Sequence, residues 1–153
     1  MSIAGVWWNE LKSKMTIKID PADPRAISGE YQTAVGGAIS SPYPLTGRCD
    51  DAGAKNQTVG WVVAFDPPDP PLPGKPPHLP SLTAWSGQWH EVTDSAGKVF
   101  EFITTTWILT EQTDPTDEWD STLVNSDIFF RTMPSATDVA KAKAFGKAAR
   151  FIK

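Results

Sequence analysis

The chain has 153 residues and a formal net charge of −4, with seven tryptophans and a single cysteine. This length suits one domain with one hydrophobic core, and the negative charge gives no electrostatic footprint for nucleic acid. A lone Cys49 excludes an intramolecular disulfide, and we expect a small buried or half-buried side chain there.

No segment reaches transmembrane length, and the first residues lack the basic-then-apolar pattern of a signal peptide. The sequence as written therefore predicts a soluble, cytoplasmic protein without membrane contact, or a secreted protein if a signal has been removed. The positive charges gather near the end of the chain, where five basic residues between 134 and 153 face one Asp. We expect this basic segment to be a solvated helix, with docking to a membrane or a partner as the alternative.

Short alternating segments separated by turn residues follow one another along most of the chain, which is typical of an antiparallel sandwich or barrel. Eight strands joined by hairpins favour an up-and-down barrel, because closure removes the sheet edges. The predicted fold class is therefore all-β, an eight-stranded antiparallel up-and-down β-barrel over residues 1–133, followed by a basic helical or flexible tail over 134–153. We predict strands near residues 5–11, 15–20, 27–35, 43–50, 58–65, 81–92, 99–111 and 121–132.

Two regions depart from this alternation. Residues 66–80 hold eight of the fourteen prolines, and since proline lacks the N–H that a strand ladder needs, we predict a stiff surface loop. A recognition sequence for an aromatic groove is the alternative for this loop. Residues 135–153 are rich in Ala, Lys and Phe, which predicts a helix with Ser135 or Thr137 as its N-terminal cap.

Several predicted strands carry aromatic and small hydroxyl side chains on one face, because every second residue of a strand points the same way. A face that mixes Trp with Asn, Ser, Thr and Tyr is a poor plain core, since each buried polar group needs a partner. Such a face suits a pocket for a small ligand that has apolar surfaces and a rim of hydrogen-bonding atoms. The residues that share faces are Asn9, Leu11 and Ser13; Tyr31, Thr33 and Val35; Ser81, Thr83 and Trp85; and Trp107 and Leu109.

Six segments, taken in order, resemble the avidin and streptavidin family over roughly residues 4–136. They are residues 5–11 (GVWWNEL), 45–48 (LTGR), 60–61 (GW), 83–88 (TAWSGQ), 107–109 (WIL) and 119–127 (WDSTLVNSD). The resemblance is nearer to the bacterial and mushroom members than to the egg-white type. It implies an eight-stranded barrel that binds biotin at one end without catalysis, is usually assembled as a homotetramer, and serves to sequester the vitamin.

The resemblance also implies a role for each matching position. Asn9, Ser13 and Tyr31 would donate to the ureido oxygen of biotin, and Asp127 and Thr33 would accept from its two N–H groups. Thr83 would meet the thioether sulfur, and Ser81 with the backbone N–H of Gly37 would meet the carboxylate. The apolar lining would consist of Trp85, Trp107, Phe65, Leu109, Val35 and Leu11, with Trp119 reaching over the pocket of a neighbouring subunit.

The chain departs from the family pattern at a few positions. Phe65 stands where streptavidin-like members carry a Trp, and the smaller ring gives up about 1 kcal/mol of apolar contact at ~25 cal/mol per Å². Ser126 and Thr106 replace a His and a Gln at a subunit contact, which puts the weaker interface in doubt. We therefore expect a homotetramer, with a homodimer as the competing assembly.

Two other classes of function remain to be weighed. The barrel could hold a different small amphipathic ligand, such as a lipid or pigment. An enzyme is disfavoured because only His78 and His90 are present, both expected to be solvated, without metal-ligand spacing or a phosphate-cradling loop. The sequence thus predicts no catalytic residue, no metal and no cofactor, with biotin as the ligand.

Overall fold

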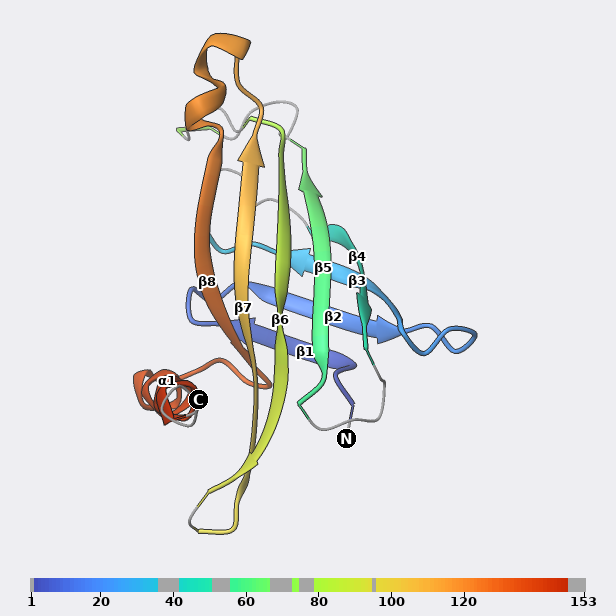
Figure 1. The fold of residues 1–153 in the computed structure, drawn as a ribbon, viewed down its shortest axis with the longest axis vertical. Helices are drawn as coiled ribbons and strands as arrows, with labels where there is room; N and C mark the ends of the chain where they lie inside the picture. Colours follow the sequence, from blue (N-terminus) through green and yellow to red (C-terminus); the bar gives the residue numbers. More distant parts are fainter. Residues whose placement is uncertain are drawn as a thin grey trace.

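Eight antiparallel strands close into a single barrel in which each strand pairs with its neighbours in the chain and β1 pairs with β8 (Figure 1). The computed structural model of the chain describes residues 2–35, 42–50, 56–66, 73–74, 79–94 and 96–148, and it describes residues 146–148 by their backbone alone. The closed order of the strands from β1 to β8 confirms the predicted up-and-down barrel. Its strands are β1 Gly5–Asn9, β2 Lys14–Ile19, β3 Ala26–Gln32, β4 Tyr43–Cys49, β5 Thr58–Phe65, β6 Ser81–Thr93, β7 Val99–Glu111 and β8 Thr122–Phe130.

Two of the predicted strands end earlier in the structure, each for a local reason. After β1 the chain turns, with Lys12 in a left-handed conformation (φ 71°) and its N–H bonded to the Asn9 carbonyl. After β3 the Thr33 hydroxyl engages both the N–H and the carbonyl of Val35, so the backbone there bends away from its strand. Side-chain and turn hydrogen bonds thus replace the ladder at both places.

The interior of the barrel is filled by the inward-pointing residues of every strand. β5 shows the alternation clearly, because Val59, Trp61, Val63 and Phe65 are buried while the residues between them are more exposed. Trp7, Trp61 and Trp89 are among the largest fully buried side chains. Trp8 instead lies outside the core, with the Lys14 ammonium 5.6 Å from its ring centre.

Close strand contacts in this barrel depend on residues without a side chain. A Cβ atom at Gly47 would collide with the Gly60 carbonyl and Trp61, and one at Gly87 would collide with the Thr104 carbonyl. Both glycines therefore allow the neighbouring strand to come closer than a Cβ atom would permit.

A helix that follows the barrel packs against its outer surface. α1 spans Ala136–Ala148, as predicted, and Ser135 caps it: the Ser135 Oγ accepts from the Asp138 N–H (3.2 Å) and the Asp138 carboxylate accepts from the Ser135 N–H (2.9 Å). The rest of the predicted helix, residues 149–153, lies outside the described residues. The expectation of a solvated helix is wrong for one face, because Ala142 and Phe145 pack with Phe102, Ile128 and other apolar residues of β6–β8.

The barrel has two distinct ends. The connections β1–β2, β3–β4, β5–β6 and β7–β8 lie at one end, which we call the open end, and the last of them contains a short 3-10 helix, η1 (Pro115–Asp120), that was not predicted. The chain enters the barrel and leaves α1 at the opposite, closed end (Figure 1). Most of the predicted proline-rich loop, residues 66–80, lies outside the described part of the chain. No helix among the described residues is long and apolar enough to cross a bilayer.

Candidate ligand-binding site

The open half of the barrel interior contains a cluster of buried polar side chains. Each member belongs to a different strand or to a hairpin at the open end, and none is more than 8% exposed. Burial of this many hydrogen-bonding groups needs partners, from the protein or from a ligand. The cluster, called the polar cluster below, consists of Asn9, Ser13, Tyr31, Thr33, Thr83 and Asp127, with Trp85 beside it.

The β1–β2 hairpin fixes two donors of the polar cluster. The Asn9 Oδ1 accepts hydrogen bonds from the N–H groups of Leu11 (3.0 Å) and Ser13 (2.8 Å), so the Asn9 amide nitrogen is its group for donating elsewhere. The Ser13 Oγ accepts from the Ala34 N–H at 3.0 Å, which turns its O–H toward the interior as a donor. Backbone N–H groups therefore decide which atom of each side chain is left to donate: those of the same hairpin for Asn9, and that of Ala34 after β3 for Ser13.

Tyr31 adds a third donor from β3. Its ring lies 5.0 Å from Trp85 and 6.1 Å from Phe65, between centroids. Burial raises the pKa of the Tyr31 phenol well above its ordinary value, although a hydrogen bond with Ser13 lowers it in part. The phenol is therefore protonated at neutral pH and donates its hydrogen.

Thr33 and Asp127 present acceptors to the same interior. The Thr33 hydroxyl donates to the Val35 carbonyl at 2.9 Å and accepts from the Val35 N–H at 3.2 Å, so the second lone pair of its oxygen is left as an acceptor. One carboxylate oxygen of Asp127, Oδ2, accepts from the Trp85 indole N–H at 3.0 Å, and the carbonyl of Asp127 accepts from the Thr105 hydroxyl at 3.1 Å. The polar cluster thus has a donor side and an acceptor side.

Aromatic rings wall this region and continue into the core. Trp85 stacks on Trp61 with 5.8 Å between centroids and 16° between planes, and Phe65 meets Tyr43 edge to face at 5.0 Å. The remaining predicted lining residues lie opposite these strands in register: Trp107 pairs with Trp85, Leu109 with Thr83, and Ser81 with Phe65. These three are half-buried, and Ser81 lies where β6 begins at the open end.

The structure does not bring every predicted site residue into the interior. Leu11 (49% exposed) and Val35 (47%) lie in the hairpins at the rim of the open end. Trp119 lies on η1 and is 81% exposed, so it lines no part of its own barrel. Gly37, the predicted backbone donor to a carboxylate, is outside the described residues.

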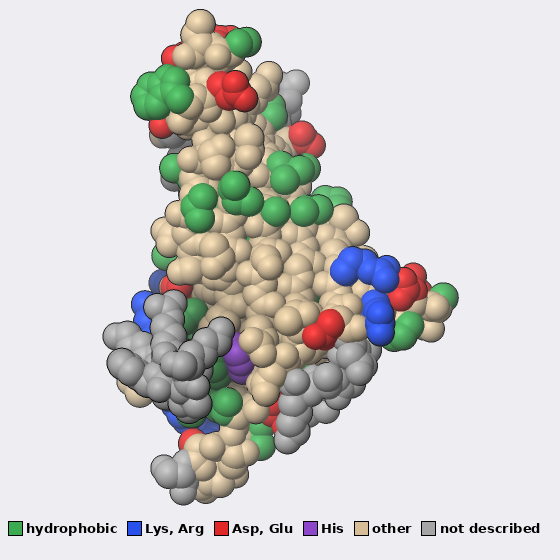
Figure 2. Space-filling view, in the orientation of Figure 1, with side chains coloured by type: hydrophobic (Ala, Val, Ile, Leu, Met, Phe, Trp, Pro, Cys, Tyr) green, Lys and Arg blue, Asp and Glu red, His purple; other side chains and the backbone are tan. Residues whose placement is uncertain are grey.

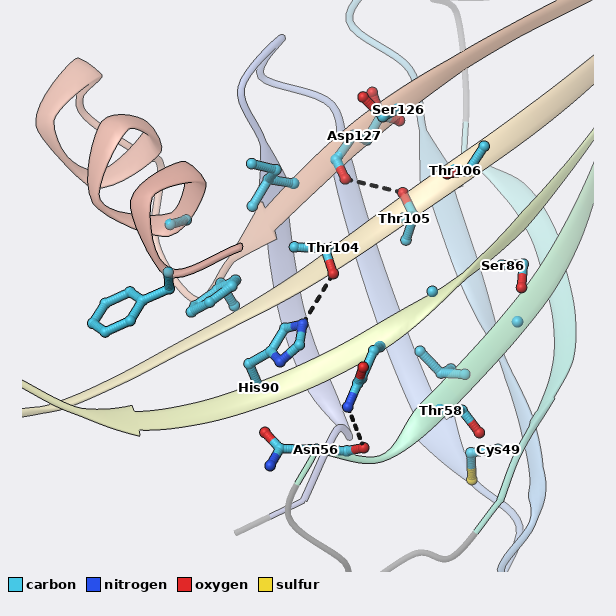
Figure 3. A pocket seen from close by; sticks show the side chains of 18 of the residues that line it. Cys49, Asn56, Thr58, Ser86, His90, Thr104, Thr105, Thr106, Ser126 and Asp127 are labelled. Atoms are coloured by element: carbon cyan, nitrogen blue, oxygen red, sulfur yellow. Dashed lines mark hydrogen bonds between the residues drawn. The ribbon is translucent and has the colours of Figure 1, made fainter. Parts of the chain in front are cut away.

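A groove of about 1240 Å³ runs beside α1 over β4–β8 (Figure 3). Its lining reaches Asp127 of the polar cluster and the neighbouring Thr105. Its floor is made of outward-facing small residues such as Ser86, Thr104 and Thr106. His90, expected to be solvated, instead stacks on Phe102 (4.8 Å between centroids) and bonds Thr104 (3.0 Å), so that prediction is wrong.

Two residues near Asp127 were not predicted. Thr105 faces the interior and bonds the Asp127 carbonyl, and its strand parity with Trp107 was a signal that could have placed it there. Glu10 bonds the backbone N–H of Ile128 at 2.9 Å, a contact across 118 positions of sequence that no local pattern indicates. In the described part of the chain, no three His, Cys, Asp or Glu side chains gather as they would around a metal ion.

A closed eight-stranded barrel with a buried donor–acceptor cluster inside one end is an architecture typical of β-barrels that hold one small ligand. The family model described as the Avidin family matches residues 1–132. The chain therefore belongs to the avidin family, whose members bind biotin and are not enzymes. The resemblance found in the sequence is confirmed, while α1 lies beyond the matched residues.

Proposed function

We propose that this protein binds biotin non-covalently inside the open half of its barrel and performs no chemistry on it. The observation that carries the proposal is the division of the polar cluster into donors and acceptors around one interior. A cyclic urea needs that division, because its oxygen accepts while its two nitrogens donate.

The ureido oxygen would receive the Asn9 amide, the Ser13 hydroxyl and the Tyr31 phenol, three donors that favour its negatively polarised form. The two ureido N–H groups would be bound by the Thr33 hydroxyl and the Asp127 carboxylate, where the bond to the ionised group is the stronger. The backbone contacts that orient Asn9 and Thr33 support this assignment, since they commit one amide to donating and one hydroxyl to accepting.

The apolar parts of biotin would lie against the rings that surround the polar cluster. Trp85, Trp107, Phe65 and Leu109 would enclose the bicycle, and Thr83 would meet the sulfur. The carboxylate would leave through the open end past Ser81, with the Gly37 N–H as a second donor and with Leu11 and Val35 at the rim. A pocket built on rigid strands limits the entropy lost on binding, and tight binding is the expected result.

A different amphipathic ligand fits the polar cluster less well. A lipid or hydrocarbon pigment would leave the groups of the cluster unpaired, at a cost of about 1–3 kcal/mol for each buried group. Such a cluster would serve no purpose in a barrel that stores an apolar molecule. Biotin is therefore the favoured occupant, and its sequestration is the favoured biological role.

We also propose that the chain assembles with copies of itself, as a tetramer or else as a dimer. One register row on the outer face of β5–β8 is apolar: Val62 pairs with Ala84, Ala84 with Ile108, and Ile108 with Val124. Figure 2 shows hydrophobic side chains in a band across this face, and three of the four are exposed in the single chain. An exposed apolar band together with Trp119 is typical of an interface.

Titration calorimetry with biotin tests the binding proposal, and one molecule per chain is expected. Asp127→Ala should weaken binding strongly, because it removes a charged acceptor. Ser126→Ala is the matched control, since Ser126 is the adjacent residue of β8 and faces outward. A fatty acid titrated in parallel should give no heat of binding. Binding of the fatty acid but not of biotin would favour the alternative ligand class.

Light scattering on the eluting peak of a sizing column tests the assembly. Val124→Glu should reduce the mass toward that of one chain, 16.7 kDa. Trp119→Ala should weaken biotin binding only while the assembly persists. A wild-type protein that elutes as a monomer at micromolar concentration would refute the assembly and leave the binding proposal standing.

A further inference from the structure

The line along which β1 meets β8, called the seam below, has no backbone pairing beyond Asn9, a member of the polar cluster. β1 pairs with β8 at two positions only, Trp8 with Phe130 and Asn9 with Phe129. The next antiparallel pair would be Glu10 with Ile128, but there the chain has left β1 for the hairpin. The Ile128 N–H therefore has no ladder partner on β1, and the Glu10 Oε2 accepts its hydrogen bond instead, at 2.9 Å.

The peptide group between Asp127 and Ile128 is consequently held from both sides. Its carbonyl, that of Asp127, accepts from the Thr105 hydroxyl on β7 at 3.1 Å. Its N–H, that of Ile128, donates to Glu10 from the β1–β2 hairpin. Because this peptide carries the Asp127 side chain, its orientation decides where the carboxylate points, and that carboxylate is further fixed by the Trp85 indole at 3.0 Å.

The position of Glu10 is unfavourable for its charge. Burial raises the pKa of the Glu10 carboxyl and the nearby charge of Asp127 raises it further, while the Ile128 N–H and, more weakly, Lys143 of α1 lower it. A neutral acceptor would close the seam without that repulsion. A second acid beside Asp127 is better understood as part of the arrangement around that residue than as a stabilising contact.

We propose that Glu10 is a positioning residue of the binding site: by holding the Asp127–Ile128 peptide across the β1–β8 seam, it aims the Asp127 carboxylate at the ligand. This role rests on the proposed function, since Asp127 is the residue through which Glu10 acts. Glu10 itself touches no ligand in this arrangement, and Thr105 completes the same support from the other strand.

A measurement without ligand tests the positioning directly. The hydrogen-exchange rate of the Trp85 indole N–H, followed by NMR, reports whether the Asp127 carboxylate stays in place. Glu10→Ala should speed this exchange several-fold, and Glu10→Gln should restore it because the amide oxygen can accept from Ile128. The Trp7 indole, which donates to the Ile3 carbonyl at 2.8 Å, should be unchanged and serves as the internal control.

A double-mutant cycle with biotin tests the route through Asp127. Glu10→Ala should weaken binding about tenfold, the loss expected for one misplaced charged hydrogen bond, whereas Glu30→Ala on the outer face of β3 should not. In the Asp127→Ala background, Glu10→Ala should add little. An equal loss in both backgrounds, or an unchanged Trp85 exchange rate in Glu10→Ala, would overturn the proposal. A wild-type chain that ignores biotin would instead refute the proposed function, and the exchange rates would still decide the role of Glu10.

Discussion

The two halves of the barrel interior are both buried but differ in chemistry. The closed half contains Trp7, Trp61 and Phe129, each 2% exposed or less, and the open half contains Asn9, Ser13 and the other members of the polar cluster, none of them more than 8% exposed. The same strands supply both halves. β8, for example, carries Asp127 in the open half and Phe129 two residues further on. Burial therefore does not distinguish a core from a binding site in this fold, whereas the chemistry of the buried groups does.

The difference has an energetic consequence. Aromatic rings of the closed half pack against one another and stabilise the fold, while burial of the polar groups of the open half costs hydration free energy. A ligand that bonds these groups would recover part of this cost. Substitutions in the two halves should therefore separate stability from affinity.

The largest expected effect lies in the closed half. Trp61 is fully buried and contacts both Trp85 and Phe129. Trp61→Ala should lower the free energy of unfolding by about 3–5 kcal/mol, because it leaves a cavity in the core. Equilibrium denaturation measures this loss, and the exposed Trp119→Ala is the control, expected within about 0.5 kcal/mol of wild type in the dissociated chain. Similar losses in the two variants would contradict the assignment of Trp61 to the packed core.

The reverse pattern is expected for a donor of the open half. Tyr31→Phe removes only the phenolic oxygen and keeps the ring against Trp85. Affinity for biotin should fall by about 0.5–1.5 kcal/mol, the net contribution of one hydrogen bond. Stability without ligand should stay the same or rise, because a buried hydroxyl is lost. A clear fall in stability with unchanged affinity would place Tyr31 in the core instead of the site.

An increase in affinity for biotin is expected at Phe65, because its ring offers less apolar surface to the ligand than a Trp would. Phe65→Trp should strengthen biotin binding by about 1 kcal/mol through added contact at ~25 cal/mol per Å². Phe129→Trp, the same exchange in the packed closed half, should instead destabilise the fold by overpacking. Calorimetry on the first variant and denaturation on both decide the matter, and weaker binding by Phe65→Trp would show that the wall has no spare room.

The smallest expected effect concerns the outer surface beside α1, and it is a pH dependence. Burial lowers the pKa of His90 below its ordinary value of about 6.5, so the unfolded chain takes up the proton more readily than the folded one. The contribution of His90 to stability is therefore present above that pH and is lost as the pH falls below it. Denaturation at several pH values should show the decline in wild type and a flatter profile in His90→Gln. Identical profiles in the two proteins would contradict this contribution of His90.

The sequence predicted the barrel well because strand alternation is a local property. All eight strands were placed, and the parity argument correctly grouped Asn9 with Ser13 and Thr83 with Trp85. The ends of β1 and β3 were less predictable, since they depend on the turn at Lys12 and on the hydroxyl of Thr33. The docking of Phe145 against Phe102 could not be derived, because it joins segments distant in the chain.

The same limit applies to the site. Its donors and acceptors could be named from residue type and family resemblance, but their polarity is set by contacts that only the fold provides. The Ser13 hydroxyl is oriented by the Ala34 N–H, 21 positions away in the sequence, and the peptide after Asp127 is held by Glu10 from the opposite end of the sequence. Such contacts between remote residues leave no periodic signal.

The start of β1 and the end of β8 both lie at the closed end, which has a practical consequence. A fused enzyme, a fluorescent protein or a surface tether attached ahead of β1 would join the barrel on the side away from the polar cluster (Figure 1). The hairpins of the open end, past which the proposed ligand would enter, would then be remote from the attachment.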